Sequence, residues 1–157
     1  MIEERIPTYL KRFEEALQSG RIKKLDFIFP KQLVKEEFGI SAKEFKEYGE
    51  LMKAYHDEVI FYFGRLYEFL DFEELHFTGR YPDAMALLDG KKVGIEFEVL
   101  SGDFKHRDVS KCDIIVCWRK NKDIYDGDRK LEILELEPFM KVLLRFMAEQ
   151  EEETSNV

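Results

Sequence analysis

The dipeptide Asp89-Gly90 constrains the fold of this chain more than any other feature of its sequence. It separates two runs of largely apolar residues, 83–88 and 92–100. A type I′ turn needs a positive φ at both central positions, and Asp-Gly is one of the pairs that tolerate this. The sequence therefore predicts that these two runs form a tight antiparallel hairpin.

Three carboxylates, Asp83, Glu96 and Glu98, lie in this hairpin among residues that otherwise favour burial. Side chains on a strand alternate between faces, so Glu96 and Glu98 share one face while Ile95 and Phe97 point to the other. Hairpin pairing places Asp83 beside the acidic face. Carboxylates packed together raise one another's pKa, and a divalent cation relieves the repulsion. Mg²⁺ or Mn²⁺ suits such oxygen ligands. The alternative is a sheet with one wet face and ordinary solvated glutamates.

Helical spacing dominates the first half of the chain, and strand-like alternation dominates the second. The sequence "QSG" ends the first helix, and Ser41 with Glu44 forms a capping-box pattern at the start of the longest one. The predicted helices cover 6–17, 30–39, about 42–70, a short stretch between Ser101 and Ser110, and 138–150; the predicted strands cover about 74–79, 83–88, 92–100, 113–118 and 131–136. We therefore expect an α/β fold with a mixed sheet flanked by helices.

The length of 157 residues is that of one domain. We expect one domain over residues 1–150, with a helical extension over 1–40, an α/β core over 41–150 and an acidic, frayed tail over 151–157. No apolar stretch is long enough to span a membrane, and the N-terminus lacks a signal-peptide pattern. The sequence thus predicts a soluble, cytoplasmic protein with no membrane partner. Cys112 and Cys117 match no metal or redox motif, so we expect buried, reduced thiols.

The net charge of −8 argues against a protein that coats nucleic acid by bulk electrostatics. Any contact with nucleic acid must be local. The segment 101–122 is the best candidate, because its six Lys and Arg residues outnumber its three Asp residues. The phosphate-loop, dinucleotide-binding, serine-hydrolase and zinc-protease motifs are all missing from the sequence.

The order helix, strand, strand with Pro82-Asp83, strand with Glu96-Phe97-Glu98, helix, strand resembles the PD-(D/E)XK nuclease superfamily, whose fold is restriction-endonuclease-like. The resemblance covers about residues 50–120. It implies a Mg²⁺- or Mn²⁺-dependent nuclease whose partner is nucleic acid, DNA rather than RNA, with Asp83 and Glu96 as metal ligands.

Glu98 stands where the superfamily usually has lysine, which changes what this position can do. A carboxylate can ligate a second metal or accept a proton from water, but it offers no positive charge. Lys105, just downstream, is the candidate to supply that charge. The alternative is that Lys105 is simply solvated.

Four further residues complete the predicted site. Members of the superfamily often place an acid on the helix before the sheet, and Glu58 interrupts the apolar stripe of the 42–70 helix. A buried carboxylate needs a partner, so Glu58 is a candidate metal ligand, or else it pairs with a Lys or Arg. Ser101, His106 and Arg107 are candidate substrate contacts. Ordinary alternatives are a helix cap for Ser101 and a surface position for His106.

Two other function classes stay open. One is a nuclease-like fold that has lost its chemistry and serves as a binding or scaffold module, which the missing motif lysine and the acidic net charge favour. The other is a helical interaction protein that uses its Phe-rich first half, residues 1–70, for oligomerisation as a homodimer.

Overall fold

A five-stranded mixed sheet organises the molecule. The computed structural model describes residues 2–23, 56–105 and 108–155. The strands of the sheet follow the order β1-β2-β3-β4-β7. Their bounds are β1 Phe72–Phe77, β2 Ala84–Leu88, β3 Lys91–Leu100, β4 Ile114–Arg119 and β7 Glu132–Glu135. The first three strands pair antiparallel, and β3, β4 and β7 pair parallel. The prediction of an α/β fold with a mixed sheet is confirmed.

The β2–β3 hairpin forms as the Asp-Gly pair predicts. Asp89 and Gly90 have φ angles of 54° and 78°, the left-handed values that this turn requires. The turn sets a register that runs from Leu88 opposite Lys91 to Ala84 opposite Ile95. This register places the start of β2 beside the middle of β3.

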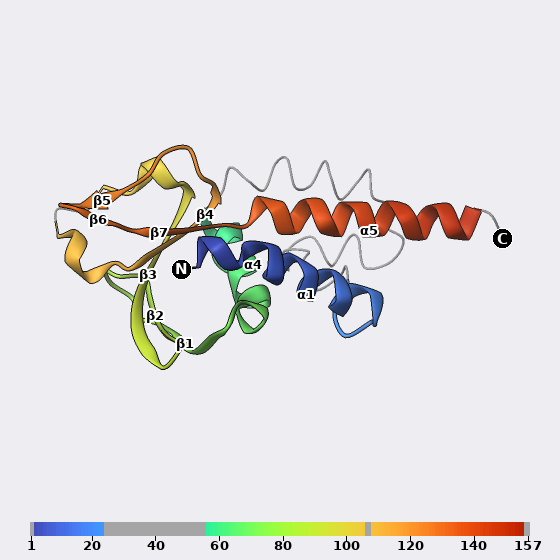
Figure 1. The fold of residues 1–157 in the computed structure, drawn as a ribbon, viewed down its shortest axis with the longest axis horizontal. Helices are drawn as coiled ribbons and strands as arrows, with labels where there is room; N and C mark the ends of the chain where they lie inside the picture. The colour runs from blue at the N-terminus through green and yellow to red at the C-terminus, as the bar shows by residue number, and fades with distance from the viewer. Residues whose placement is uncertain (1, 24–55, 106–107, 156–157) are drawn as a thin grey trace.

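Three α-helices pack on one face of the sheet: α1 (Ile6–Gln18), α4 (His56–Leu66) and α5 (Glu137–Ser155). Pro7 lies in the first turn of α1, where its missing N–H has no intrahelical partner to lose. Figure 1 shows α1 and α5 side by side, and the rings of Phe13 and Phe139 join them edge to face at 5.6 Å. Aromatic pairs of this geometry stabilise a core by about 1 kcal/mol beyond their burial. Thus α1 belongs to the main hydrophobic core.

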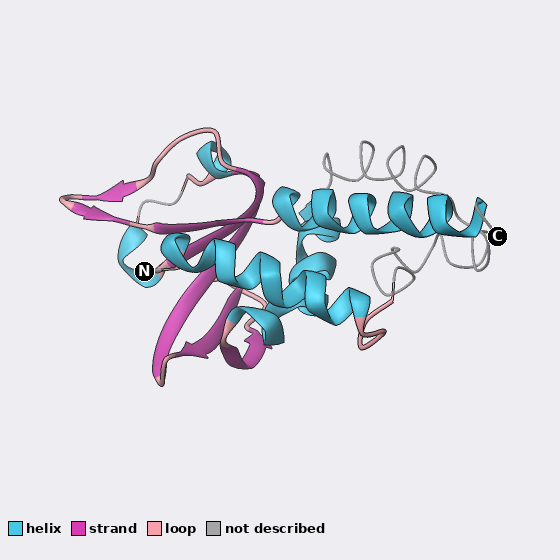
Figure 2. Ribbon diagram, turned by 45° about the vertical axis from the view of Figure 1, so that its right-hand side comes forward, coloured by secondary structure: helices cyan, strands magenta, loops and turns pink. Residues whose placement is uncertain are grey.

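The opposite face of the sheet has a smaller hydrophobic cluster, which includes Cys112, Ile115 and Cys117. Its cover, within the described residues, consists of 3₁₀ turns and loops together with a small second sheet of β5 (Tyr125–Asp126) and β6 (Arg129–Lys130). Figure 2 shows this second sheet projecting away from the α-helices. The described α-helices therefore flank the sheet on one face. Both cysteines are buried and unbridged, as predicted.

The segment after β3 differs from its prediction. In place of one helix between Ser101 and Ser110, two 3₁₀ turns form, η4 (Ser101–Asp103) and η5 (Val109–Lys111), and residues 106 and 107 lie outside the described part. The physical reason is local hydrogen bonding by short acidic side chains. Asp103 accepts the backbone N–H of Leu100, and Asp108 accepts that of Ser110. Such bonds offer the backbone an alternative to a helix.

The remaining differences lie at the ends of helices. The last helix, α5, continues to Ser155, through most of the segment predicted to fray, because that segment begins with three glutamates, which favour a helix. Before the sheet, α4 begins the described part at His56 and is followed by a 3₁₀ turn, η3 (Tyr67–Leu70). The predicted helix over 30–39, the capping box and the first part of the 42–70 helix lie outside the described residues. None of the described helices is both long and apolar enough to cross a membrane.

Candidate functional site

The candidate site lies where β2 separates from β3. The paired register of the two strands ends at Ala84 opposite Ile95. Extending that register would place Pro82 opposite Phe97. Proline has no backbone N–H, so it cannot donate a ladder hydrogen bond at this position. The backbone of Phe97 must therefore find other partners.

Two side chains supply those partners. Asp83 Oδ2 accepts the backbone N–H of Phe97 at 3.1 Å, and His56 Nε2 lies 2.8 Å from the Phe97 carbonyl oxygen. A carbonyl oxygen only accepts, so the His56 Nε2 must carry the proton. The same His56 nitrogen lies 3.8 Å from Asp83 Oδ2. In return, Glu96 Oε1 accepts the backbone N–H of Asp83 at 2.8 Å. Asp83 and Glu96 are thus fixed against each other's strands.

Glu98 lies beside this pair. The pKa of Glu98 is raised, first by burial and then by the negative charge of Glu96. Asp103 and Asp83 also raise it, and His56 lowers it. The structure therefore brings Asp83, Glu96 and Glu98 close enough to repel one another, with His56 opposing their charge.

The three predicted metal ligands are not assembled as a set. Glu58 is buried on α4, with 5% of its surface exposed. Within the residues that the structure describes, no group of three or more His, Cys, Asp or Glu side chains is arranged to hold a metal ion. Of the predicted metal ligands, Asp83 and Glu96 are the two that the structure places next to each other. Mg²⁺ accepts one or two carboxylates and keeps several waters, and each carboxylate has about four lone-pair sites for donors and cations together, so the donor chemistry of the pair suits such an ion.

The position of Ser101 does not support its predicted contact with phosphate. Ser101 is fully buried, and its hydroxyl donates to the Lys122 carbonyl at 2.7 Å. It also accepts the backbone N–H groups of Asn121 and Lys122 at 3.1 and 3.2 Å. One donor and two lone pairs are then all engaged, so Ser101 joins η4 to the segment after β4. The two other predicted substrate contacts, His106 and Arg107, lie outside the described residues.

The cationic segment 101–122 is partly neutralised by ion pairs that its sequence does not reveal. Arg119 pairs with Glu137 at 2.6 Å, and Lys120 pairs with Asp123 at 2.8 Å. Lys105 is exposed and makes no hydrogen bond or ion pair within the described residues. Within the described part of the chain, Lys105 therefore forms no ion pair with Asp83, Glu96 or Glu98.

Sequence reasoning missed His56 as a part of the site, although this side chain contacts Asp83 and Phe97 and lowers the pKa of Glu98. Its contacts with Asp83 and Phe97 are long-range and follow no local pattern. The only available signal was its place at the helix preceding the sheet, two residues before Glu58.

No protein-family model, curated protein or solved structure matches this chain. The candidate site must therefore be interpreted from its own geometry.

Proposed function

We propose that this protein is a metal-dependent nuclease of the PD-(D/E)XK type, which hydrolyses phosphodiester bonds in nucleic acid, DNA rather than RNA. One observation carries the proposal: Asp83 and Glu96 are fixed by reciprocal backbone hydrogen bonds at the point where β2 leaves β3, with Glu98 beside them. The Asp83 side chain is partly exposed at this separation of the strands, and Glu96 lies beneath it, with 4% of its surface exposed.

In this proposal Asp83 and Glu96 hold Mg²⁺ or Mn²⁺. Such an ion, when bound, would polarise the phosphate group and lower the pKa of the attacking water. Glu98 acts as the base that takes a proton from water. Its raised pKa suits this role, because a carboxylate with a higher pKa is a stronger proton acceptor. His56 keeps Asp83 and the Phe97 backbone in place through its ring nitrogen.

A binding or scaffold module is the second candidate. Two observations favour it: Glu98 replaces the usual lysine, and no described group of three ligands is present. In that case the backbone hydrogen bonds of Asp83 and Glu96 would be purely structural.

Substitution of the two carboxylates tests the proposal. Asp83→Asn and Glu96→Gln each retain an oxygen that can accept the same backbone hydrogen bond, so the fold should survive. Each should lower the rate of metal-dependent cleavage by about 100-fold or more and weaken Mn²⁺ binding measured by titration calorimetry. Glu73→Gln, an exposed carboxylate on β1, is the matched control and should behave as wild type.

Two results would count against the nuclease. Either variant could keep the wild-type cleavage rate at saturating Mg²⁺ and Mn²⁺, which would remove its carboxylate from the site. Alternatively, the wild-type protein could cut no DNA or RNA, single- or double-stranded, with either metal; the scaffold module would then replace the nuclease.

A further inference from the structure

A cavity of about 740 Å³ opens beside the candidate site, between the end of β1 and the start of β2. Phe77 and Pro82 are among the residues that line it, and Pro82 directly precedes Asp83. Pockets of 300–1,000 Å³ hold ligands of drug size, roughly that of a nucleotide. The cavity is therefore large enough for one unit of a nucleic-acid chain.

The charge of the cavity is opposite to that of the chain as a whole. Arg80 and Lys111 line it, and no Asp or Glu of the described residues does, although the chain has 33 acidic residues against 25 basic ones. The side chains of Arg80 and Lys111 make no hydrogen bond or ion pair within the described part. In contrast, Arg119 and Arg129 each contact a carboxylate. The side chains of Arg80 and Lys111 are therefore available to bind an anionic ligand.

The cavity also presents an exposed aromatic ring. Phe77 is 53% exposed, one of two large hydrophobic side chains among the described residues with so much exposed surface. Its ring lies 5.9 Å from that of Phe97, with the two planes inclined by only 31°. One side of the Phe77 ring is thus supported by the core. Its exposed surface offers a π-face to a ligand beside the carboxylates.

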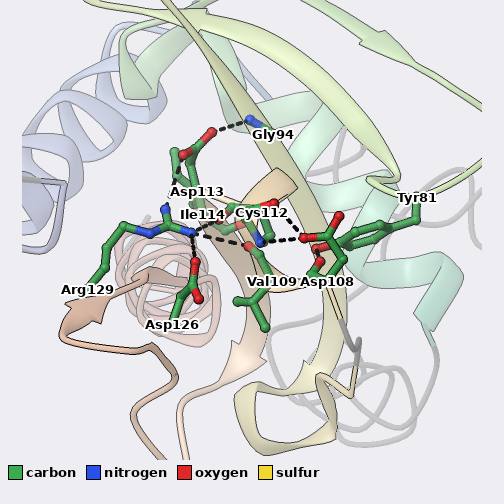
Figure 3. A network of polar contacts seen from close by, with 10 residues as sticks. Tyr81, Gly94, Asp108, Val109, Cys112, Asp113, Ile114, Asp126 and Arg129 are labelled. Atoms are coloured by element: carbon green, nitrogen blue, oxygen red, sulfur yellow. Dashed lines mark hydrogen bonds and ion pairs between the residues drawn. The ribbon is translucent and has the colours of Figure 1, made fainter.

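The wall of the cavity is held in place by a polar network, drawn in Figure 3. The Tyr81 hydroxyl donates to the backbone carbonyl of Asp108 at 2.6 Å. The Asp113 carboxylate accepts the Gly94 N–H at 2.8 Å and also contacts Arg129 at 3.3 Å. Arg129 donates in addition to two backbone carbonyls of the segment 108–113. The segment that carries the cavity's lysine is thereby tied to β3, and such preorganisation lowers the cost of binding.

From these features we infer that the cavity binds one unpaired nucleotide of the substrate, with Phe77 stacked on the base and Arg80 and Lys111 contacting phosphate. This inference rests on the proposed nuclease function and names its substrate class as single-stranded nucleic acid. In a duplex both faces of each base are covered by neighbouring bases. Only an unpaired base presents a face to an aromatic side chain.

Binding without cleavage tests the inference. Fluorescence anisotropy with a labelled 12-nucleotide oligothymidylate in EDTA measures affinity alone. Phe77→Ala should weaken binding by roughly 5- to 150-fold, the range for loss of one base–aromatic stack. Phe77→Tyr should retain most of the affinity, whereas Phe77→Leu, which keeps an apolar side chain without a π-face, should not. Arg80→Ala and Lys111→Ala should each reduce the salt dependence of binding.

Tyr125→Ala is the matched control. Tyr125 is exposed to a similar extent, 56%, but lies on β5 and does not line the cavity, so its removal should leave the affinity unchanged. A blunt duplex of the same length should bind more weakly than the single strand, with no dependence on Phe77.

The outcomes separate this inference from the nuclease proposal. If the wild type binds and cuts nucleic acid while Phe77→Ala and Phe77→Leu bind the oligothymidylate as the wild type does, the nucleotide site is refuted and the nuclease stands. If binding depends on Phe77 as expected but no metal supports cleavage, the nucleotide site stands and the nuclease falls. If the wild type does not bind the single strand, the inference is overturned.

Discussion

The close approach of Gly94 to the segment 108–113 leads to a sharp prediction for Gly94→Ala. A Cβ atom added at Gly94 would lie 2.0 Å from the backbone oxygen of Lys111 and 3.3 Å from Cγ of Pro82. Ordinary van der Waals contact begins at 3.4 Å. The Lys111 carbonyl is backbone, so the whole segment must move by more than an ångström to admit the methyl group.

The cost follows from the bonds that hold that segment. Gly94 N–H donates to the Asp113 carboxylate at 2.8 Å, and Asp113 N–H donates to the Gly94 carbonyl at 2.9 Å. Loss of one or two such bonds costs about 1 kcal/mol each, and overpacking adds about 1–3 kcal/mol. We therefore expect a loss of about 3 kcal/mol in the free energy of unfolding. For a chain of this length that corresponds to a fall of about 6–12 °C in melting temperature.

Thermal unfolding followed by circular dichroism measures this change. Gly64→Ala is the matched control, because Gly64 is exposed on α4 and no heavy atom lies within 4 Å of its added Cβ. This control should raise stability by about 0.5–1 kcal/mol, since alanine favours a helix over glycine. A Gly94→Ala protein that melts within about 2 °C of the wild type would refute the reasoning, because it would show that the segment yields at no cost.

Two further predictions concern Glu98 and Lys105. The pKa of Glu98 is raised in the folded protein, so the native state holds this proton more tightly than the unfolded chain does, and stability is lost as pH rises through the folded-state pKa. Glu98→Gln should therefore melt above the wild type at pH 7, with the difference vanishing below the ordinary glutamate value of about 4.3; equal melting temperatures at pH 7 would contradict the repulsion. Lys105→Ala should weaken nucleic-acid binding and lower its salt slope by about one, without changing the single-turnover cleavage rate at saturating substrate. A lower single-turnover rate would instead place Lys105 at the transition state.

The sheet could be predicted from sequence because its rules are local. The Asp89-Gly90 turn and the alternation of β3 fix the hairpin without any information from the rest of the chain. The segment after β3 could not be predicted in the same way. There Asp103 and Asp108 bind backbone N–H groups nearby, and this competition decides against a helix.

The features of the candidate site also differ in whether local sequence rules could predict them. Strand periodicity and hairpin register were sufficient to place Asp83 beside Glu96 and Glu98. Contacts between distant segments were not predictable, because they depend on how the helices and strands pack. The approach of His56 to Phe97 is one example, and the neutralisation of Arg119 by Glu137 is another. For the same reason, the exposure of Phe77 became apparent only with the structure.

The structure also explains why this chain places acids on strands that are otherwise apolar, and the explanation differs from one acid to the next. Asp83 and Glu96 each accept a backbone N–H at the separation of β2 from β3, so the fold alone gives a reason for both. Glu98 has no hydrogen bond within the described residues, yet burial and its acidic neighbours raise its pKa. A residue that lowers stability and makes no structural hydrogen bond is typical of a functional site. Glu98 is therefore the acid whose presence most requires a function, and its replacement by glutamine should separate activity, which would fall, from stability, which would rise.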